Sequence, residues 1–191
     1  MDTNKISDLQ RDLAVRSHWN IGFFIAGFLF WIYVAIVGSI FDLNTAKKYW
    51  LVGTFFIFPA AVLASKFVGA DPFTKGNKLA DLVGFTHMSV IALSLPIVIA
   101  SYLYSPELML LVMGICYCID FFVMSWAYGT RIFGIHAVVR MLAITYVWFF
   151  LPELRLLLIP IIVALAYLIT ICLIPGNRRA FLNSYVKQSA V

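Results

Sequence analysis

Six long hydrophobic segments, separated by short polar connections, dominate this chain of 191 residues. A helix needs about 20 mainly apolar residues to cross the hydrocarbon core of a bilayer. The segments that meet this requirement cover residues 21–41, 49–67, 82–104, 107–128, 132–151 and 154–174. Hydrophobic residues make up 63% of the chain, which leaves too much apolar surface for a small soluble core. The predicted fold class is therefore all-α: a polytopic membrane protein, a bundle of six transmembrane helices.

Proline and glycine residues divide the predicted helices. Pro59, Pro96 and Pro160 fall inside predicted spans, where each is expected to kink its helix. The pair Pro175-Gly176 follows the sixth apolar segment and predicts the end of that helix. Residues 176–191 would then form a short tail outside the bilayer.

Basic residues predict how the bundle is oriented. If the N-terminus lies in the cytoplasm, ten Lys and Arg residues fall on the cytoplasmic side and three on the outer side, which is the usual bias of cytoplasmic loops. Both termini are therefore expected in the cytoplasm, before and after a six-helix domain over residues 19–175. Within residues 1–18, Ile6, Leu9 and Leu13 recur at helical spacing, which fits either an interfacial helix or a solvated tail.

The formal net charge of +5 indicates lipid headgroups rather than nucleic acid as the partner, because the basic residues flank apolar segments. The residues expected to contact anionic headgroups at the cytoplasmic face are Lys75, Lys78, Arg131, Arg178 and Arg179. The predicted location is the cell membrane, in a multi-pass protein, and a homo-oligomer is left open.

Ionisable side chains inside the predicted spans are the main functional signal, since charge is costly there. The predicted intramembrane polar cluster comprises His87, Tyr117, Asp120, His136 and Arg140. Asp120 and Arg140 each lie ten residues from Thr130 in the turn between their helices, so both are about 15 Å from that turn. These matched depths predict a salt bridge, within a polar pocket that the third, fourth and fifth spans form and that opens to the cytoplasm. Alternatively, the pair only locks two helices together.

No metal site or cofactor is expected. The three histidines form no His-x-x-x-His or Glu-x-x-His pair, which are common metal-ligand spacings. The chain also lacks a Gly-x-Ser-x-Gly sequence, a Walker loop and a dinucleotide fingerprint. Catalytic residues are therefore not assigned, and an enzyme is the less expected class.

Three stretches resemble a known family. They are Asp12-Leu-Ala-Val-Arg16, Ser65-Lys66 followed by Asp71-Pro-Phe-Thr-Lys-Gly-Asn-Lys78, and Ser125-Trp-Ala-Tyr128. Their placement is similar to that in a family of bacterial integral membrane proteins known only as a domain of unknown function. The resemblance covers nearly the whole chain and implies a six-helix protein of the bacterial cytoplasmic membrane. It implies no activity and no functional residue.

Three functions fit these features. Intramembrane charges and prolines favour transport or binding of a small solute or ion through the polar pocket. A non-catalytic scaffold, partner subunit or oligomeric effector needs only the helices and their locking pair. An intramembrane enzyme acting on a lipid would use Asp120, His87 and His136 for acid–base chemistry, with Arg131 and Arg140 holding a phosphate. Transport or binding is preferred, because polar residues at matched depths require a reason.

Overall fold

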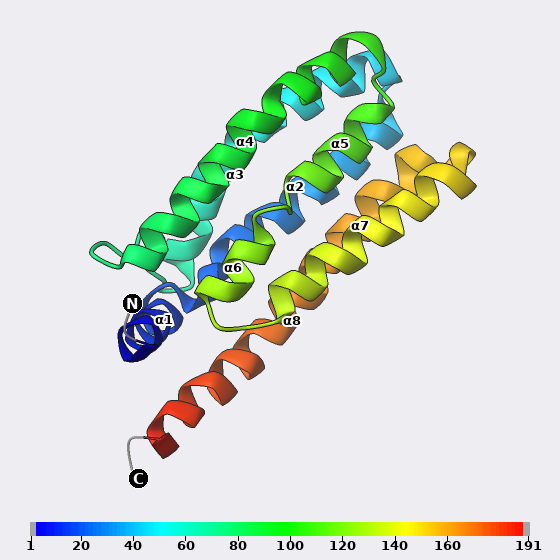
Figure 1. Cartoon of the computed structure of the whole chain (residues 1–191). Coiled ribbons are helices and arrows are strands. Elements are labelled where there is room, and N and C mark those ends of the chain that lie inside the picture. The colour runs from blue at the N-terminus through cyan, green and yellow to red at the C-terminus, as the bar shows by residue number, and fades with distance from the viewer. Residues whose placement is uncertain (1–2, 189–191) are drawn as a thin grey trace.

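The computed structural model describes residues 3–188, and every regular element within that range is helical. This confirms the all-α prediction. The chain begins with α1 (Thr3–Arg16) and the short turn η1 (His18–Asn20), which leads into α2 (Ile21–Ile40). The elements that follow are α3 (Leu43–Phe67), α4 (Lys78–Tyr104), α5 (Leu108–Cys116), α6 (Phe121–Ala127), α7 (Ile132–Phe150), η2 (Pro152–Leu154) and α8 (Arg155–Gln188) (Figure 1).

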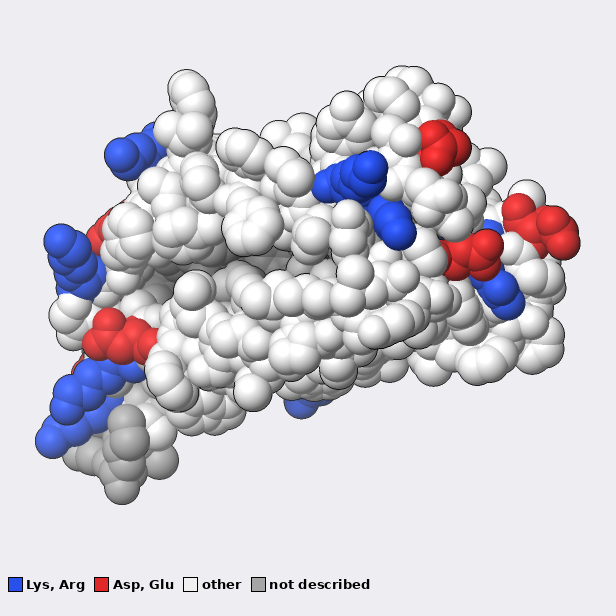
Figure 2. Space-filling model, turned by 90° about the horizontal axis from the view of Figure 1, so that it is seen from above, with Lys and Arg blue, Asp and Glu red and all other residues white. Residues whose placement is uncertain are grey.

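Six helical stretches in the described range are long and apolar enough to cross a membrane. The N-terminus and the C-terminus lie at the same end of the bundle (Figure 1). We call this end of the bundle the terminal end. Most charged side chains on the face shown in Figure 2 gather toward its two ends. This arrangement fits a multi-pass membrane protein, in which lipid surrounds the apolar middle of each helix.

Side-chain caps explain where α3 and α4 begin. The side chain of Asp42 accepts hydrogen bonds from two backbone N–H groups in the first turn of α3, and Asn77 does the same for α4. Such caps satisfy donors that otherwise have no partner within the helix. Both helices therefore begin several residues before the apolar stretches predicted at 49–67 and 82–104.

The fourth predicted span, residues 107–128, is not one continuous helix. α5 ends at Cys116 and α6 begins at Phe121, with residues 117–120 in turns between them. Around this break the N–H groups of Cys118 and Ile119 bond to carbonyls three residues earlier, which is the tighter 3₁₀ pattern. The break sets Asp120 directly before the first residue of α6.

The last helix continues past Pro175-Gly176, so the prediction that it ends there is wrong. A proline removes one backbone hydrogen bond and crowds the preceding turn, but contacts beyond it hold the extension in place. Arg178 donates hydrogen bonds to two backbone carbonyls of α1, and the ring of Phe181 packs edge-on against Trp19. Residues 176–188 are therefore helical, and residues 189–191 of the predicted tail lie outside the described residues.

α1 is packed onto the rest of the structure. Leu13 and Ala14 are fully buried, so this face of the helix contacts protein. Within the bundle, α2 packs along α3 and α8, whereas α4 packs mainly on α5 and α6. α3 and α4 thus rest on different neighbours, and this arrangement creates the site described next.

Candidate functional site

A cavity of about 700 Å³ lies between α3 and α4, and we call it the α3–α4 cavity. Its other walls come from α2, α6, the loop before α4, Tyr117 and Tyr167. Aromatic rings line it from five helices, for example Phe23 of α2, Phe55 of α3 and Phe121 of α6. A volume of this size is within the range that binds small molecules, about 300–1,000 Å³.

The cavity opens sideways. Phe55 of α3 and Phe85 of α4 both line it, yet they are 70% and 73% exposed. Their neighbours Phe58 and Met88 line the cavity and are exposed as well. Figure 2 views the molecule from the side on which α3 and α4 lie and shows a hollow bordered by uncharged side chains. Apolar rings at an open rim indicate a surface that faces lipid or an apolar ligand.

His87 is the polar side chain that joins this cavity to the protein interior. It lines the cavity, and its Nδ1 lies 2.6 Å from Oδ2 of Asp120. The His87 side chain is 26% exposed, whereas that of Asp120 is 1% exposed. Asp120 is therefore buried deeper in the protein than His87. Its Oδ1 has no hydrogen-bond partner among the described residues. A buried carboxylate oxygen without a hydrogen-bond partner is rare and calls for an explanation.

The predicted salt bridge between Asp120 and Arg140 is absent from the described structure. Asp120 pairs with His87 instead, and no N···O distance of 4.0 Å or less joins it to Arg140. The physical reason is the helix break before α6, which turns Asp120 toward α4. Equal depth along two helices does not fix the direction in which each side chain points.

Arg140 is fully buried in the bundle core, between Trp31 of α2 and Tyr167 of α8. Its Nη1 donates a hydrogen bond to the Tyr167 hydroxyl at 3.2 Å, and its guanidinium lies over the rings of Trp31 and Tyr167. Within the described range, Nε and Nη2 of Arg140 have no hydrogen-bond partner. Two aromatic faces thus stabilise a cation that no carboxylate neutralises directly.

His136 lies one helical turn before Arg140 and is also buried. Its Nδ1 lies 2.7 Å from the Thr170 hydroxyl oxygen of α8, and its ring packs against Tyr167. Neither His136 nor Arg140 lines the α3–α4 cavity. The predicted cluster therefore divides in two: His87, Asp120 and Tyr117 at the cavity, and His136 with Arg140 against α8.

The pocket itself differs from the prediction. A polar pocket was expected among the third, fourth and fifth spans, but the cavity is mainly apolar, and α2 and α3 supply much of its wall. α7, the fifth span, supplies none of the described lining residues. In the sequence, the aromatic residues of α2 and α3 look like ordinary residues of an apolar helix. No local sequence pattern therefore identifies them as cavity-lining residues.

A hydrogen-bond network at the terminal end was not predicted either, and we call it the N-terminal network: Asp12, Arg16, Asp71 and Asn77. Arg16 lies 2.8 Å from Asp71 and 3.3 Å from Asp12, and Asn77 donates to Asp12 at 2.8 Å. Arg16 also donates to the backbone carbonyl of Lys75, next to Thr74 and Gly76 in the cavity wall. This network fixes the loop that closes the cavity at the terminal end.

The basic residues expected at headgroups have different surroundings. Lys75 lines the cavity, and Arg178 is bonded to α1. Lys78, Arg131 and Arg179 are exposed near the terminal end. Contact of these residues with anionic lipid stays a prediction.

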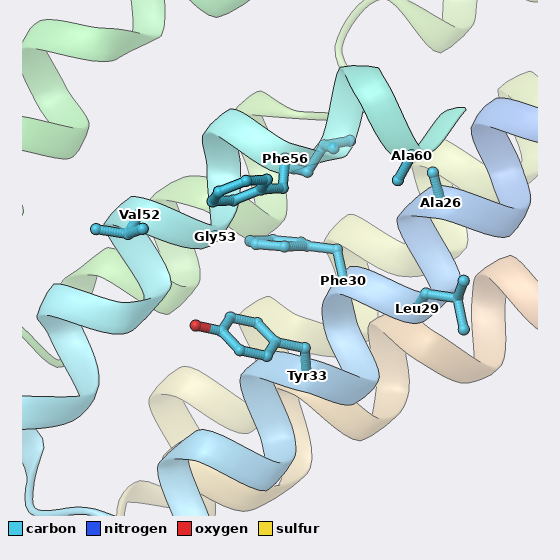
Figure 3. A pocket seen from close by; sticks show the side chains of 9 residues that line it. Ala26, Leu29, Phe30, Tyr33, Val52, Gly53, Phe56 and Ala60 are labelled. Carbon is cyan, nitrogen blue, oxygen red and sulfur yellow. The ribbon is translucent and has the colours of Figure 1, made fainter. Parts of the chain in front are cut away.

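A second hollow, of about 360 Å³, lies between α2 and α3 (Figure 3). Phe30 of α2 and Phe56 of α3 point into it from opposite sides. The Tyr33 hydroxyl donates to the backbone carbonyl of Tyr49, so the one polar lining side chain already has a partner. None of the residues that line this hollow is charged at neutral pH, and we do not assign it a function.

The described residues form an all-helical protein with six helical stretches long and apolar enough to cross a membrane and with ionisable groups buried in its core. The chain belongs to a family of unknown function, DUF7010, whose model matches residues 6–176. This confirms the resemblance drawn from the three sequence stretches. Comparison with curated proteins and with solved structures found no match.

Proposed function

We propose that this chain is a multi-pass protein of the cytoplasmic membrane, with both termini in the cytoplasm, that binds a small, mainly apolar molecule. The terminal end of the bundle carries both chain ends and most of the basic residues, which supports that orientation. The single observation that carries the binding proposal is the α3–α4 cavity, with aromatic walls and with His87 backed by buried Asp120.

The two kinds of lining residue have separate tasks. The aromatic side chains remove the apolar part of the ligand from water or lipid and give it shape-specific contacts. His87 supplies one polar contact that Asp120 orients, because the carboxylate occupies Nδ1 and leaves Nε2 for the ligand.

Energy transfer from Trp31 tests this proposal, because Trp31 lines the cavity. The probe is N-phenyl-1-naphthylamine, a small fluorophore that brightens in apolar sites and accepts energy from tryptophan. We expect saturable transfer to the probe in lipid nanodiscs that carry the protein. The Trp31→Phe variant should reduce the saturable part, since four other tryptophans remain as donors.

Gly84 and Gly176 provide a matched pair of variants. A Cβ at either position meets no atom within 4 Å, but Gly84 lines the cavity and Gly176 does not. Gly84→Leu should weaken probe binding about tenfold or more by filling the cavity, and Gly176→Leu should leave it unchanged. Equal transfer in both variants would show that the probe binds elsewhere and would remove the proposal.

The helix break at Asp120 favours transport as the use of this binding, since discontinuous helices form the binding sites of many carriers. If the break moves with the ligand, amide hydrogen exchange across residues 117–121 should change when the probe binds. The change should be absent in Gly84→Leu. Unchanged exchange in the wild-type protein would favour a protein that binds without moving its ligand.

A further inference from the structure

The α3–α4 cavity is elongated along α4. Its lining on this helix runs from Ala80 to Leu95, a separation of about 22 Å at 1.5 Å per residue. One leaflet of a bilayer has a hydrocarbon thickness of about 15 Å, half of the full core. The cavity is therefore long enough for a molecule that reaches from a headgroup region past the depth of one leaflet.

The shape of the cavity also limits which ligands suit it. A volume of about 700 Å³ spread over that length is an elongated space. Such a shape suits an extended hydrocarbon chain better than a compact ligand. The opening between exposed Phe55 and Phe85 gives such a chain a route from the surrounding lipid.

Charge is confined to one end of the cavity. Lys75 and Asp81 line the terminal end, and His87 lies about two turns further along α4. Lys75 and Asp81 form no ion pair with each other within the described structure. Beyond His87, the lining residues of α4 are Met88, Ile91 and Leu95. One end thus offers a cation and a carboxylate, and α4 beyond His87 offers only apolar contact.

Resting on the proposed function, we propose that the ligand is a lysophospholipid of the cytoplasmic leaflet: one acyl chain and a zwitterionic head. The Lys75 ammonium binds the phosphate, the Asp81 carboxylate binds the head's ammonium, and the chain lies along α4 toward Leu95. A fatty acid or a lysolipid with a purely anionic head can pair with Lys75 but has no ammonium for Asp81. The Asp81 carboxylate then lies near the ligand's negative charge without a partner, and this repulsion selects against both.

Displacement of N-phenyl-1-naphthylamine from the Trp31 site tests this assignment. The competitors are lysophosphatidylethanolamine, lysophosphatidylglycerol, palmitate and two-chain phosphatidylethanolamine, each added to the protein in detergent. Lysophosphatidylethanolamine should displace the probe at the lowest concentration, and two-chain phosphatidylethanolamine at the highest. Equal or better displacement by either anionic competitor would overturn the assignment of the head, and equal displacement by the two-chain lipid would overturn the single chain.

Variants at the charged end separate the two contacts. Asp81→Asn should weaken displacement by lysophosphatidylethanolamine about two- to fivefold and should not weaken displacement by lysophosphatidylglycerol. Lys75→Gln should weaken displacement by both lysolipids, whereas Lys78→Gln, a control outside the cavity, should weaken neither. An Asp81→Asn variant with unchanged selectivity would overturn the zwitterion proposal. If lysolipids fail to displace a probe that does bind, this inference fails and the proposed function stands; if the probe does not bind, both fail.

Discussion

Arg140 shows most clearly how a single buried charge depends on its neighbours. An arginine presents five N–H donors, but among the described residues only Tyr167 accepts a hydrogen bond from this one. The rings of Trp31 and Tyr167 supply the remaining stabilisation. The free energy of this buried cation therefore depends strongly on the Tyr167 hydroxyl.

Removing that hydroxyl should destabilise the protein. Tyr167→Phe leaves a buried charge without its acceptor, and we expect a loss of about 1–3 kcal/mol in the free energy of unfolding. In an Arg140→Met background the same substitution should cost much less, because no charge is left unpaired. Denaturant unfolding of the four variants in detergent measures this cycle. Equal costs in both backgrounds would show that Tyr167 acts by packing alone.

A second cycle tests the partner of Asp120. His87→Gln and Asp120→Asn should be coupled by about 1 kcal/mol or more, because the two side chains share a hydrogen bond at 2.6 Å. Asp120→Asn and Arg140→Gln should be closer to additive. The reverse pattern, with strong coupling to Arg140 and none to His87, would restore the salt bridge that matched depths predict.

At the scale of elements, the N-terminal network ties α1 to the loop before α4. Burial alone would raise the pKa of Asp71, but hydrogen bonds from the Phe73 backbone and from Arg16, with the charge of Arg16, hold it below its ordinary value of 3.8. A carboxyl group with a lowered folded-state pKa stabilises the fold above its unfolded value and loses that contribution as the pH falls through the folded value. Docking of α1 should therefore weaken in acid.

The pH dependence can be measured by amide hydrogen exchange in α1, corrected for the intrinsic rate. Protection of residues 6–16 should fall as the pH drops below about 4. Asp71→Asn should lower this protection at neutral pH and flatten its pH dependence. Asp42→Asn is the control, since Asp42 caps α3 away from α1. Protection of α1 that is insensitive both to acid and to Asp71→Asn would contradict this role of the network.

Some of the helical elements can be predicted from the sequence more easily than others, and the reasons are physical. Hydropathy reveals the six apolar stretches because lipid solvation acts on every residue of a span. The break at residues 117–120 has no proline or glycine to reveal it. The extension of α8 past Pro175 depends on contacts of Arg178 with α1, which are distant in sequence. Tertiary contact therefore overrides the local rule.

Some residues of the candidate site can be predicted from the sequence and others cannot, for similar reasons. His87, Tyr117 and Asp120 could be found because polar groups in an apolar span are conspicuous. Their aromatic surroundings could not, because phenylalanine occurs in five of the six predicted spans and does not distinguish a site. The partner of Asp120 depends on the rotation of α6 about its axis, and sequence spacing gives only depth.

At the scale of the whole molecule, both termini lie at one end of the bundle. A fluorescent protein fused after residue 191 should therefore be fluorescent in bacterial cells, and alkaline phosphatase fused at the same position should be inactive. Alkaline phosphatase fused after Ser105, in the connection before α5, should be active. An active phosphatase at the C-terminus would contradict the proposed orientation.

We propose that α3 and α4 enclose a ligand cavity at the level of the membrane. An experimental structure of the protein in nanodiscs that contain lysophosphatidylethanolamine, solved for the wild type and for Gly84→Leu, tests it most directly. We predict elongated density along α4 from Lys75 toward Leu95 in the wild type, and none in Gly84→Leu. A wild-type structure in which α3 packs directly against α4, with His87 sealed from lipid and no space between the helices, would contradict the claim.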